Sequence, residues 1–425
     1  MARSVFSGNY IRLSTMMFLE FFVLGATNPV FSLYLKDQLN FSGSQTGSIL
    51  ATSAVSALIS PVIGAMIADK LIRAERLLAV IHFCGAAVIY FLSVQTGFIQ
   101  VLALYLVYWL LIGPSVALTT TITFHHSLNN SNSFGIIRLW GTIGWFAAAW
   151  VFSYVVSLNN NPVDSCGNLH WALYLACAAS VILGLYSFTL PTGIGKKEKS
   201  SNFNLNDSLK IVLKPQILLL ALFSIIITFA DRFYMFGAAP FLKTLNFSES
   251  KIMPVLSIGQ VPEIVGLCFL GFFLSRLGLK KVLLLGIFFE ISRFVIFSTG
   301  TVGLPLMAGI SFHGLTYAFF FIPVTIFLDN CSDRYSRASV HQLFSIITGG
   351  IGNLAGNLLA GFAADIFTVS SSDSQINFTH FWIVPLVLSI LGLFGISICL
   401  RDKKQKVDTG MPEFDKSEKP VFSES

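Results

Sequence analysis

The sequence predicts an all-α integral membrane protein with twelve transmembrane helices. Of its 425 residues, 54% are hydrophobic and only 11% are charged, whereas soluble proteins average roughly 45–50% apolar and about 25% charged residues. A soluble chain of this length would have too few charged residues to cover its surface, so the apolar surplus must face lipid. This composition excludes an ordinary soluble enzyme.

The expected helices follow from apolar runs of about 20 residues, the length that crosses about 30 Å of hydrocarbon. These continuous runs lack the alternating pattern of barrel strands, so they predict helices. The twelve spans are, in order, 12–35, 45–68, 77–96, 98–123, 135–157, 170–191, 213–240, 252–274, 280–299, 303–328, 339–366 and 378–400. The first run has no cleavage pattern of small residues, and we expect it to remain as a membrane helix.

The basic residues predict how these spans are oriented. With a cytoplasmic N-terminus, 21 of the 27 lysines and arginines lie on the cytoplasmic side, three lie on the opposite side and three lie within spans. Cytoplasmic loops of membrane proteins collect positive charge, so both termini are expected to be cytoplasmic, in a plasma membrane or a bacterial inner membrane. The basic residues form only short clusters, and no nucleic-acid partner is expected.

A polar segment divides the chain between the sixth and seventh spans. We expect a six-helix half at 1–191, a cytoplasmic linker at 192–212, a second six-helix half at 213–400 and a disordered cytoplasmic tail at 401–425. The loops after the second and eighth spans correspond across this division, and they carry Asp69 and Lys70 in the first and Arg276 in the second. Paired halves are typical of transporters, and these three charged residues are candidates for a conformational latch.

No motif indicates a metal centre, a cofactor or an enzyme. The six cysteines form no CxxC pair, so neither a disulfide framework nor a zinc site is expected. The chain has no GxSxG or Walker loop, and no cluster of histidines, cysteines and carboxylates has metal-ligand spacing.

Seven charged residues lie inside the predicted spans at least three residues from either end, where each costs on the order of 2.5–3.5 kcal/mol on insertion scales. Such residues normally face a cavity or pair with one another. They are Glu20, Arg138, Asp231, Arg232, Glu263, Glu290 and Arg293. The spacing of Glu290 and Arg293 favours a structural pair within one helix. Glu20, near the middle of the first span, is a candidate for proton coupling or binding.

The fifth and eighth spans carry the strongest candidates for solute binding. Arg138, Thr142 and Trp145 share one helix face, which offers a cation, a hydroxyl and an aromatic plane to a polar solute with a ring. The alternative is that Arg138 anchors a helix end at the membrane interface. Gln260 and Glu263 flank Pro262 in the eighth span. Glu263 is either a proton carrier, because an apolar medium favours a neutral carboxyl group, or the permanent partner of an arginine.

The seventh and tenth spans add further candidates. Asp231 and Tyr234 share a face, while Arg232 points about 100° away, so we expect the two adjacent charges not to cancel on one surface. Asp231 either lines a cavity or forms an interfacial anchor with Arg232. His313 and Tyr317 are four residues apart in the tenth span. An intramembrane histidine is more often a core hydrogen-bonding group than a proton relay, although its chemistry permits either role.

Several segments resemble the nucleoside:proton symporter family of the major facilitator superfamily. They are RLWGTIGW at 138–145, SIGQVPE at 257–263, HGLTY at 313–317 and LSTMMFLEFFVLGA at 13–26. The resemblance implies two six-helix halves around a central cavity that takes up nucleosides by proton symport through alternating access, usually as a monomer and without a cofactor.

The resemblance also implies which residues bind the substrate. The family's binding residues correspond to Arg138, Thr142, Trp145, Gln260 and Glu263. The chain departs from the family pattern at Asp231 and Tyr234 in the seventh span and at Ala318, which replaces an acidic residue in the tenth. We therefore expect Asp231 or Glu263 to couple transport to protons. The alternatives are a carrier of another small polar solute, such as a sugar, and a membrane sensor that does not transport.

Overall fold

The computed structural model describes residues 8–57, 59, 73–126, 131–158, 168–191, 210–332, 337–369 and 375–400. Within these ranges the secondary structure consists of helices, short turns and one isolated bridge between Thr368 and Ile376. The predicted all-α class is therefore confirmed for the described part of the chain.

The first group of helices precedes residue 191. They are α1 (Gly8–Leu33), η1 (Tyr34–Gln38), α2 (Gly43–Ala51), η2 (Thr52–Ala54), α4 (Ala74–Ser93), α5 (Phe98–His126), α6 (Ser131–Leu158) and α7 (His170–Ser187). Helix α1 packs against α6 and α7, and α4 packs against α5 and α7. We refer to these helices as the N-terminal group.

The second group begins after residue 210. Its helices are α9 (Pro215–Thr244), α10 (Glu249–Ser257), α11 (Gln260–Leu277), α12 (Leu279–Ser298), α13 (Leu304–Thr316), η3 (Tyr317–Phe321), α14 (Ile322–Cys331), α15 (Arg337–Ser345), η4 (Ile346–Gly352), α16 (Asn353–Ile366) and α17 (Phe378–Cys399). Helix α17 packs against α9 and α12, and α16 packs against α9. We refer to these helices as the C-terminal group.

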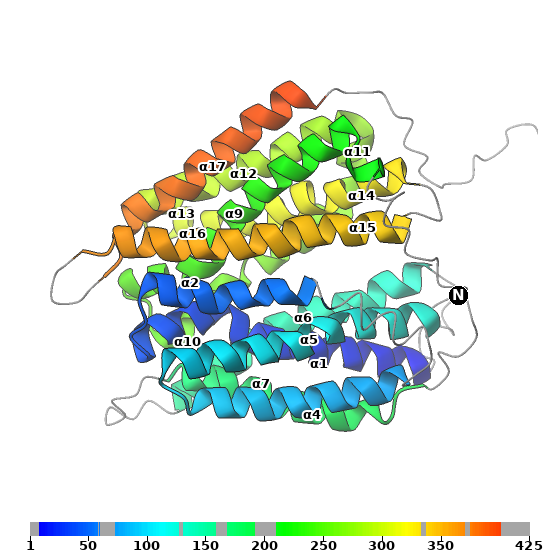
Figure 1. Ribbon diagram of the computed structural model, residues 1–425, viewed down its shortest axis with the longest axis vertical. Coiled ribbons are helices and arrows are strands. Elements are labelled where there is room, and N and C mark those ends of the chain that lie inside the picture. The colour runs from blue at the N-terminus through cyan, green and yellow to red at the C-terminus, as the bar shows by residue number, and fades with distance from the viewer. Residues whose placement is uncertain are drawn as a thin grey trace, which may run out of the picture.

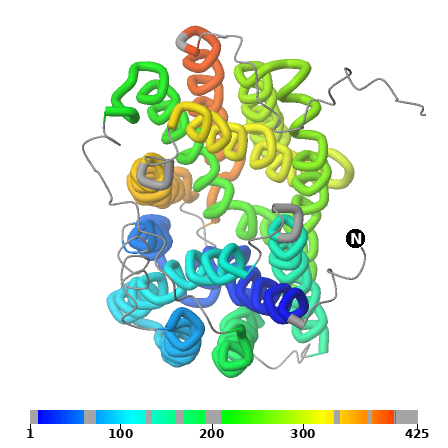
Figure 2. Tube along the Cα trace, turned by 90° about the vertical axis from the view of Figure 1, so that its right-hand side faces the viewer, coloured from blue at the N-terminus to red at the C-terminus, as the bar shows by residue number. Residues whose placement is uncertain are grey.

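The two groups lie one above the other, apart from α10, which lies among the N-terminal helices below, and most long helices run roughly parallel to one another (Figure 1). The view turned by 90° shows the same division, with the blue and cyan segments below and the yellow and orange segments above (Figure 2). Between the groups, α2 packs against α16, α6 against α10 and α1 against α9. The region between the groups is therefore bordered by helices from both parts of the chain.

Ten helical segments among the described residues are long and apolar enough to cross a membrane. Helix α12 is 20 residues long but is not among them, because Lys281, Glu290 and Arg293 lie within its span. The last part of the second predicted span, 45–68, lies outside the described residues from residue 60 on. Large apolar side chains such as Ile398 (77% exposed) cover the outside of the helices, as expected for a surface that faces lipid.

At one end of the boundary between the two groups, polar contacts hold the groups together. The Asp365 carboxylate at the end of α16 accepts hydrogen bonds from the backbone N–H groups of Gly43 (2.5 Å) and Ser44 (2.8 Å) in the first turn of α2. Nearby, Lys243 lies 3.8 Å from Asp37 of the N-terminal group. We call this region the closed end. It lies at the left of Figure 1, where α16 and α2 run side by side.

Candidate functional site

A cavity of about 380 Å³ lies between the two groups of helices. This volume is within the range of roughly 300–1,000 Å³ that small-molecule sites occupy. Its lining residues are Phe21, Arg138, Thr142, Trp145, Thr228, Asp231, Arg232, Met235, Gln260, Glu263, His313, Tyr317, Phe321, Thr348, Gly349 and Asn353. Both groups contribute to this set, so a change in their relative position would change access to the cavity.

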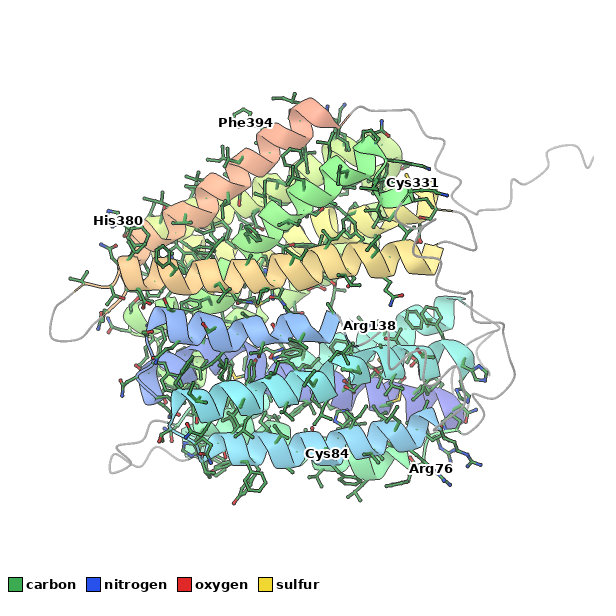
Figure 3. All side chains as sticks on the ribbon, in the orientation of Figure 1. Arg76, Cys84, Arg138, Cys331, His380 and Phe394 are labelled. Carbon is green, nitrogen blue, oxygen red and sulfur yellow. The ribbon has the colours of Figure 1, made fainter. Side chains whose placement is uncertain are left out.

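Helix α6 presents Arg138, Thr142 and Trp145 to the cavity, as the spacing of these residues predicts. Arg138 lies between the upper and lower groups in Figure 3, and its guanidinium carbon is 4.0 Å from the centre of the Phe21 ring, a cation–π contact. Gly144 allows this arrangement, because a Cβ atom there would lie 2.9 Å from the backbone carbon of Phe18 in α1. The glycines of the RLWGTIGW segment thus allow α6 to approach α1 closely.

Helix α11 contributes Gln260 and Glu263 from the opposite group. The helix begins at Gln260, directly after the break that separates it from α10, so both side chains belong to its first turn. Gly314 of α13 lets the neighbouring helix approach, since a Cβ atom there would lie 2.9 Å from the Cβ atom of Glu263. Glu263 interacts electrostatically with Arg138 across the cavity.

Helix α9 places both Asp231 and Arg232 on the cavity wall, and the prediction that these charges would stay on separate surfaces is wrong. The two Cβ atoms do point in different directions, but the long arginine side chain bends back and its Nη2 atom pairs with Oδ2 of Asp231. The Nη1 atom of Arg232 reaches Oδ1 of Asn353 at 3.4 Å. Asp231, of which 5% is exposed, therefore has a cationic partner at the edge of the cavity.

Helix α13 and the η3 turn supply His313 and Tyr317, which both line the cavity. Tyr234 lies beside them in a smaller extension of about 40 Å³ that also contains Trp145, Gln260 and His313. The Tyr234 ring stacks on the His313 ring with 4.3 Å between their centres. The cavity-lining Tyr317 and Phe321 belong to a π-helical turn, a backbone form that often occurs at functional sites.

Glu20, the candidate for proton coupling or binding in the first span, is not among the residues that line the cavity. It is fully buried inside the N-terminal group, where His82 Nε2 lies 3.0 Å from its Oε2 atom and Ser115 donates to its Oε1 atom at 2.5 Å. The other His82 nitrogen contacts Ser180 at 3.2 Å. These four residues come from α1, α4, α5 and α7, so Glu20 joins helices of one group.

The predicted pair of Glu290 and Arg293 is present and fully buried, with 2.6 Å between Glu290 Oε1 and Arg293 Nη2. The pair is not isolated, because Arg293 Nη1 also lies 2.8 Å from Nδ1 of His313. Of the latch candidates, Asp69 and Lys70 lie outside the described residues. Arg276 is exposed at the end of α11, with its guanidinium 5.2 Å from the Phe272 ring centre.

Sequence reasoning missed several lining residues, of which Asn353 has the most polar contacts. Its Nδ2 atom donates to Ser53 of the N-terminal group at 3.1 Å, and its Oδ1 atom accepts from Asn357 at 2.7 Å. The sequence does contain a pattern that could have predicted Asn353, because amides are rare in apolar spans and the glycine-rich segment GNLAGN has two asparagines four residues apart. No group of three metal-ligating side chains occurs among the residues that the structure describes.

The cavity thus combines four kinds of recognition in a small volume. Cations come from both groups of helices and carboxylates from the C-terminal group, amides and hydroxyls donate and accept hydrogen bonds, and aromatic rings offer flat apolar surfaces. Such a set suits a polar solute that contains a flat ring and several hydroxyl groups.

Known proteins resemble this chain in sequence and in fold. Residues 8–405 match the sequence profile of the family described as Nucleoside H+ symporter. The xanthosine permease of Escherichia coli is 28% identical over 410 residues, which cover 91% of this chain and 95% of that protein. The nucleoside permease NupG of Escherichia coli is 25% identical and covers 94% and 98%. The crystal structure of the nucleoside transporter NupG superposes with a TM-score of 0.80, 23% identity and coverage of 93% of this chain and 100% of that chain.

Proposed function

Because the chain belongs to the nucleoside H+ symporter family, we propose that it imports nucleosides with protons through the cavity between its two groups of helices. It is a secondary transporter and not an enzyme. The crystal structure of NupG supports the fold, which is that of the major facilitator superfamily.

The observation that carries this function is the pairing of aromatic and hydroxyl-binding side chains across the cavity. Trp145 offers an indole plane for stacking on a nucleobase. Gln260 and Glu263, on the opposite wall, suit ribose hydroxyls, which both donate and accept hydrogen bonds. Arg138 supplies fixed donors for carbonyl oxygens or ring nitrogens of the base. All four side chains line the same cavity.

We propose the following topology. Twelve helices cross a plasma membrane or a bacterial inner membrane, with six-helix halves at 1–191 and 213–400, a cytoplasmic linker at 192–212 and cytoplasmic termini. The distribution of basic residues supports this orientation. The last helix runs from His380, at the left of Figure 3 with the closed end, toward Phe394 further to the right, so it ends away from the closed end. The transporter acts as a monomer.

In this topology the closed end is extracellular. Arg138 lies near the start of α6, which runs from the cytoplasmic side, so the cavity is reached from the cytoplasm and this conformation faces inward. Alternation requires that the contacts of Asp365 with α2 break when the outward-facing state forms. Asp69, Lys70 and Arg276 remain our candidates for a latch at the cytoplasmic side.

Protons couple to transport when proton and nucleoside favour the same conformational state by a few kcal/mol of differential affinity. Two cavity carboxylates, Glu263 and Asp231, are the candidate proton carriers; Asp231 pairs with Arg232, and Glu263 interacts electrostatically with Arg138. Glu20 is no longer a candidate in the cavity, because it is enclosed in the N-terminal group.

Uptake measurements test the proposal. Labelled uridine and adenosine are offered to cells that lack their own nucleoside carriers, at acidic and alkaline external pH, with and without a protonophore. We expect accumulation at acidic pH that the protonophore abolishes, and loss of accumulation in Glu263→Gln. If correctly inserted protein takes up no nucleoside, the proposed function is contradicted. If uptake is the same with and without the protonophore, the protein transports nucleosides but does not couple their transport to protons. Sugar uptake would favour the alternative carrier.

A further inference from the structure

Behind one wall of the cavity, four ionisable side chains from three helices lie in contact. Arg293 of α12 binds Glu290 at 2.6 Å through Nη2 and lies 2.8 Å from His313 Nδ1 through Nη1. His313 Nδ1 also lies 3.5 Å from Oδ1 of Asp231. The Tyr234 ring lies against both the imidazole and, at 4.5 Å, the Arg293 guanidinium. His313 and Asp231 line the cavity, whereas Glu290 and Arg293 are fully buried.

One nitrogen atom therefore faces two partners with opposite requirements. A guanidinium group only donates hydrogen bonds, so Nδ1 of His313 must be unprotonated when it binds Arg293. A carboxylate only accepts, so the same Nδ1 can bind Asp231 only when it carries a proton. The two contacts exclude each other, and the 2.8 Å contact with Arg293 identifies the conformation in the structure as the unprotonated one.

We propose that Nδ1 of His313 binds the transported proton, and that this binding exchanges its partner from Arg293 to Asp231. The inference rests on the proposed symport function and assigns its proton site to His313 in place of Glu263 and Asp231, the two carboxylates named above, which then stabilise the protonated histidine. The proton enters from the water of the cavity, forms the N–H bond that Asp231 accepts, and leaves to water on the other side after the conformational change. Arg293 keeps its bond to Glu290 in both states.

The exchange has a path to the contact between the two groups of helices. Asp231 also holds Arg232, whose Nη1 atom reaches Asn353. Asn353 in turn donates to Ser53 of the N-terminal group. When Asp231 turns toward protonated His313, its hold on Arg232 weakens, and Arg232 is freed to change its contact with Asn353. Proton binding thereby changes the stability of a contact between the two groups of helices that must break and form during alternating access. Coupling requires such a link between proton binding and the conformational change.

Other titratable and charged groups set the electrostatic environment of His313. Without the extra proton, Arg232 balances Asp231 and Arg293 balances Glu290, so the cluster is neutral. The groups around His313 are Asp231, Arg232 and Tyr234 on α9, Glu290 and Arg293 on α12, Glu263 on α11, Tyr317 on η3 and Arg138 on α6. The proton makes the cluster cationic, and the two cavity carboxylates, Asp231 and Glu263, stabilise that state.

The first test is His313→Asn in proteoliposomes with a pH-sensitive dye inside. The asparagine oxygen accepts from Arg293 as Nδ1 does, but an amide does not bind a proton in this range. We expect uphill accumulation and nucleoside-driven proton entry to be lost, so that the ratio of proton entry to exchange of labelled for unlabelled nucleoside falls to near zero, whatever the effect on exchange itself. His380→Asn, an exposed histidine stacked on Phe367, is the matched control and should retain proton entry.

A second variant removes the competing cation. Single removal of Arg293 would leave Glu290 buried without its partner and risks misfolding, so both are changed, as Arg293→Gln with Glu290→Gln. With the like charge gone, His313 should hold its proton more readily, and the pH of half-maximal uptake should rise by about one unit or more. Proton entry retained in His313→Asn, or an unshifted pH profile in the double variant, would overturn the proposal. A wild-type protein that moves no nucleoside would overturn the proposed function instead.

Discussion

Removing the carboxylate of Asp365 should shift the transporter toward its outward-facing state. The N–H groups of the first three residues of α2, Gly43, Ser44 and Gln45, have no partner among the carbonyl groups of their own helix. Ser42 accepts from the third, that of Gln45, and Asp365 accepts from the other two, those of Gly43 and Ser44. The α2 terminus is therefore completed by the C-terminal group only while the closed end stays closed.

The magnitude follows from these two bonds. Hydrogen bonds to charged groups contribute about 1.5–3 kcal/mol each when buried, and loss of a capping side chain costs about 0.5–2 kcal/mol. Asp365 is partly exposed, and water takes over its hydrogen bonds when the closed end opens. The smaller range, that of a capping side chain, therefore applies. Asp365→Ala should destabilise the closed end by about 1–2 kcal/mol, which raises the ratio of open to closed molecules by about 5–30-fold.

Distances between spin labels measure this ratio directly. Thr96 and Thr301 are exposed in the turns after α4 and α12, one in each group and both at the closed end, and Thr96→Cys with Thr301→Cys carries the labels in a variant without native cysteines. Asp365→Ala should move population to longer distances. Asp37→Asn is the control, because the Asp37–Lys243 pair is long and exposed and such pairs contribute little. A distance distribution in Asp365→Ala that equals that of the control would refute the reasoning.

Three further predictions concern the cavity and the packing around it. Trp145→Ala should weaken nucleoside binding by about 1–3 kcal/mol, the scale of base stacking on an aromatic side chain, while Trp145→Phe retains most of the affinity; binding calorimetry distinguishes them. Glu20→Ala should lower the free energy of unfolding by about 3–5 kcal/mol, because His82 loses a buried partner, and should leave the nucleoside Kd unchanged. A changed Kd with an unchanged free energy of unfolding would place Glu20 in the binding site. Gly144→Val should reduce the yield of folded protein, since its side chain would meet the backbone of Phe18, and size-exclusion chromatography would show it; a normal elution profile would contradict the packing argument.

The sequence was most informative where helical periodicity alone decides the outcome. Arg138, Thr142 and Trp145 fall on one face because of their spacing, and that face meets the cavity. The long apolar runs likewise predict helices, since lipid leaves few alternatives to the chain.

Contacts between distant helices lay beyond the sequence. Glu20 looked like a cavity residue because its partner His82 is 62 positions away, and no local pattern reveals such pairing. Arg232 was misjudged because its direction was taken from Cβ geometry, whereas a long side chain can reach a neighbour on another face. Asn353 was overlooked because its partners, Ser53 and Arg232, lie on other helices.

The enclosed contacts of Glu20 have a consequence for the transport cycle. They tie α1, α4, α5 and α7 together through groups that are fully buried, and separating these helices would strand a carboxylate in apolar surroundings. The N-terminal group should therefore move as a rigid body, and the contacts that change during transport should be those on its outer surface. Amide hydrogen exchange in these four helices should then stay slow in every conformation, while exchange near Gly43 and Ser44 follows each opening of the transporter.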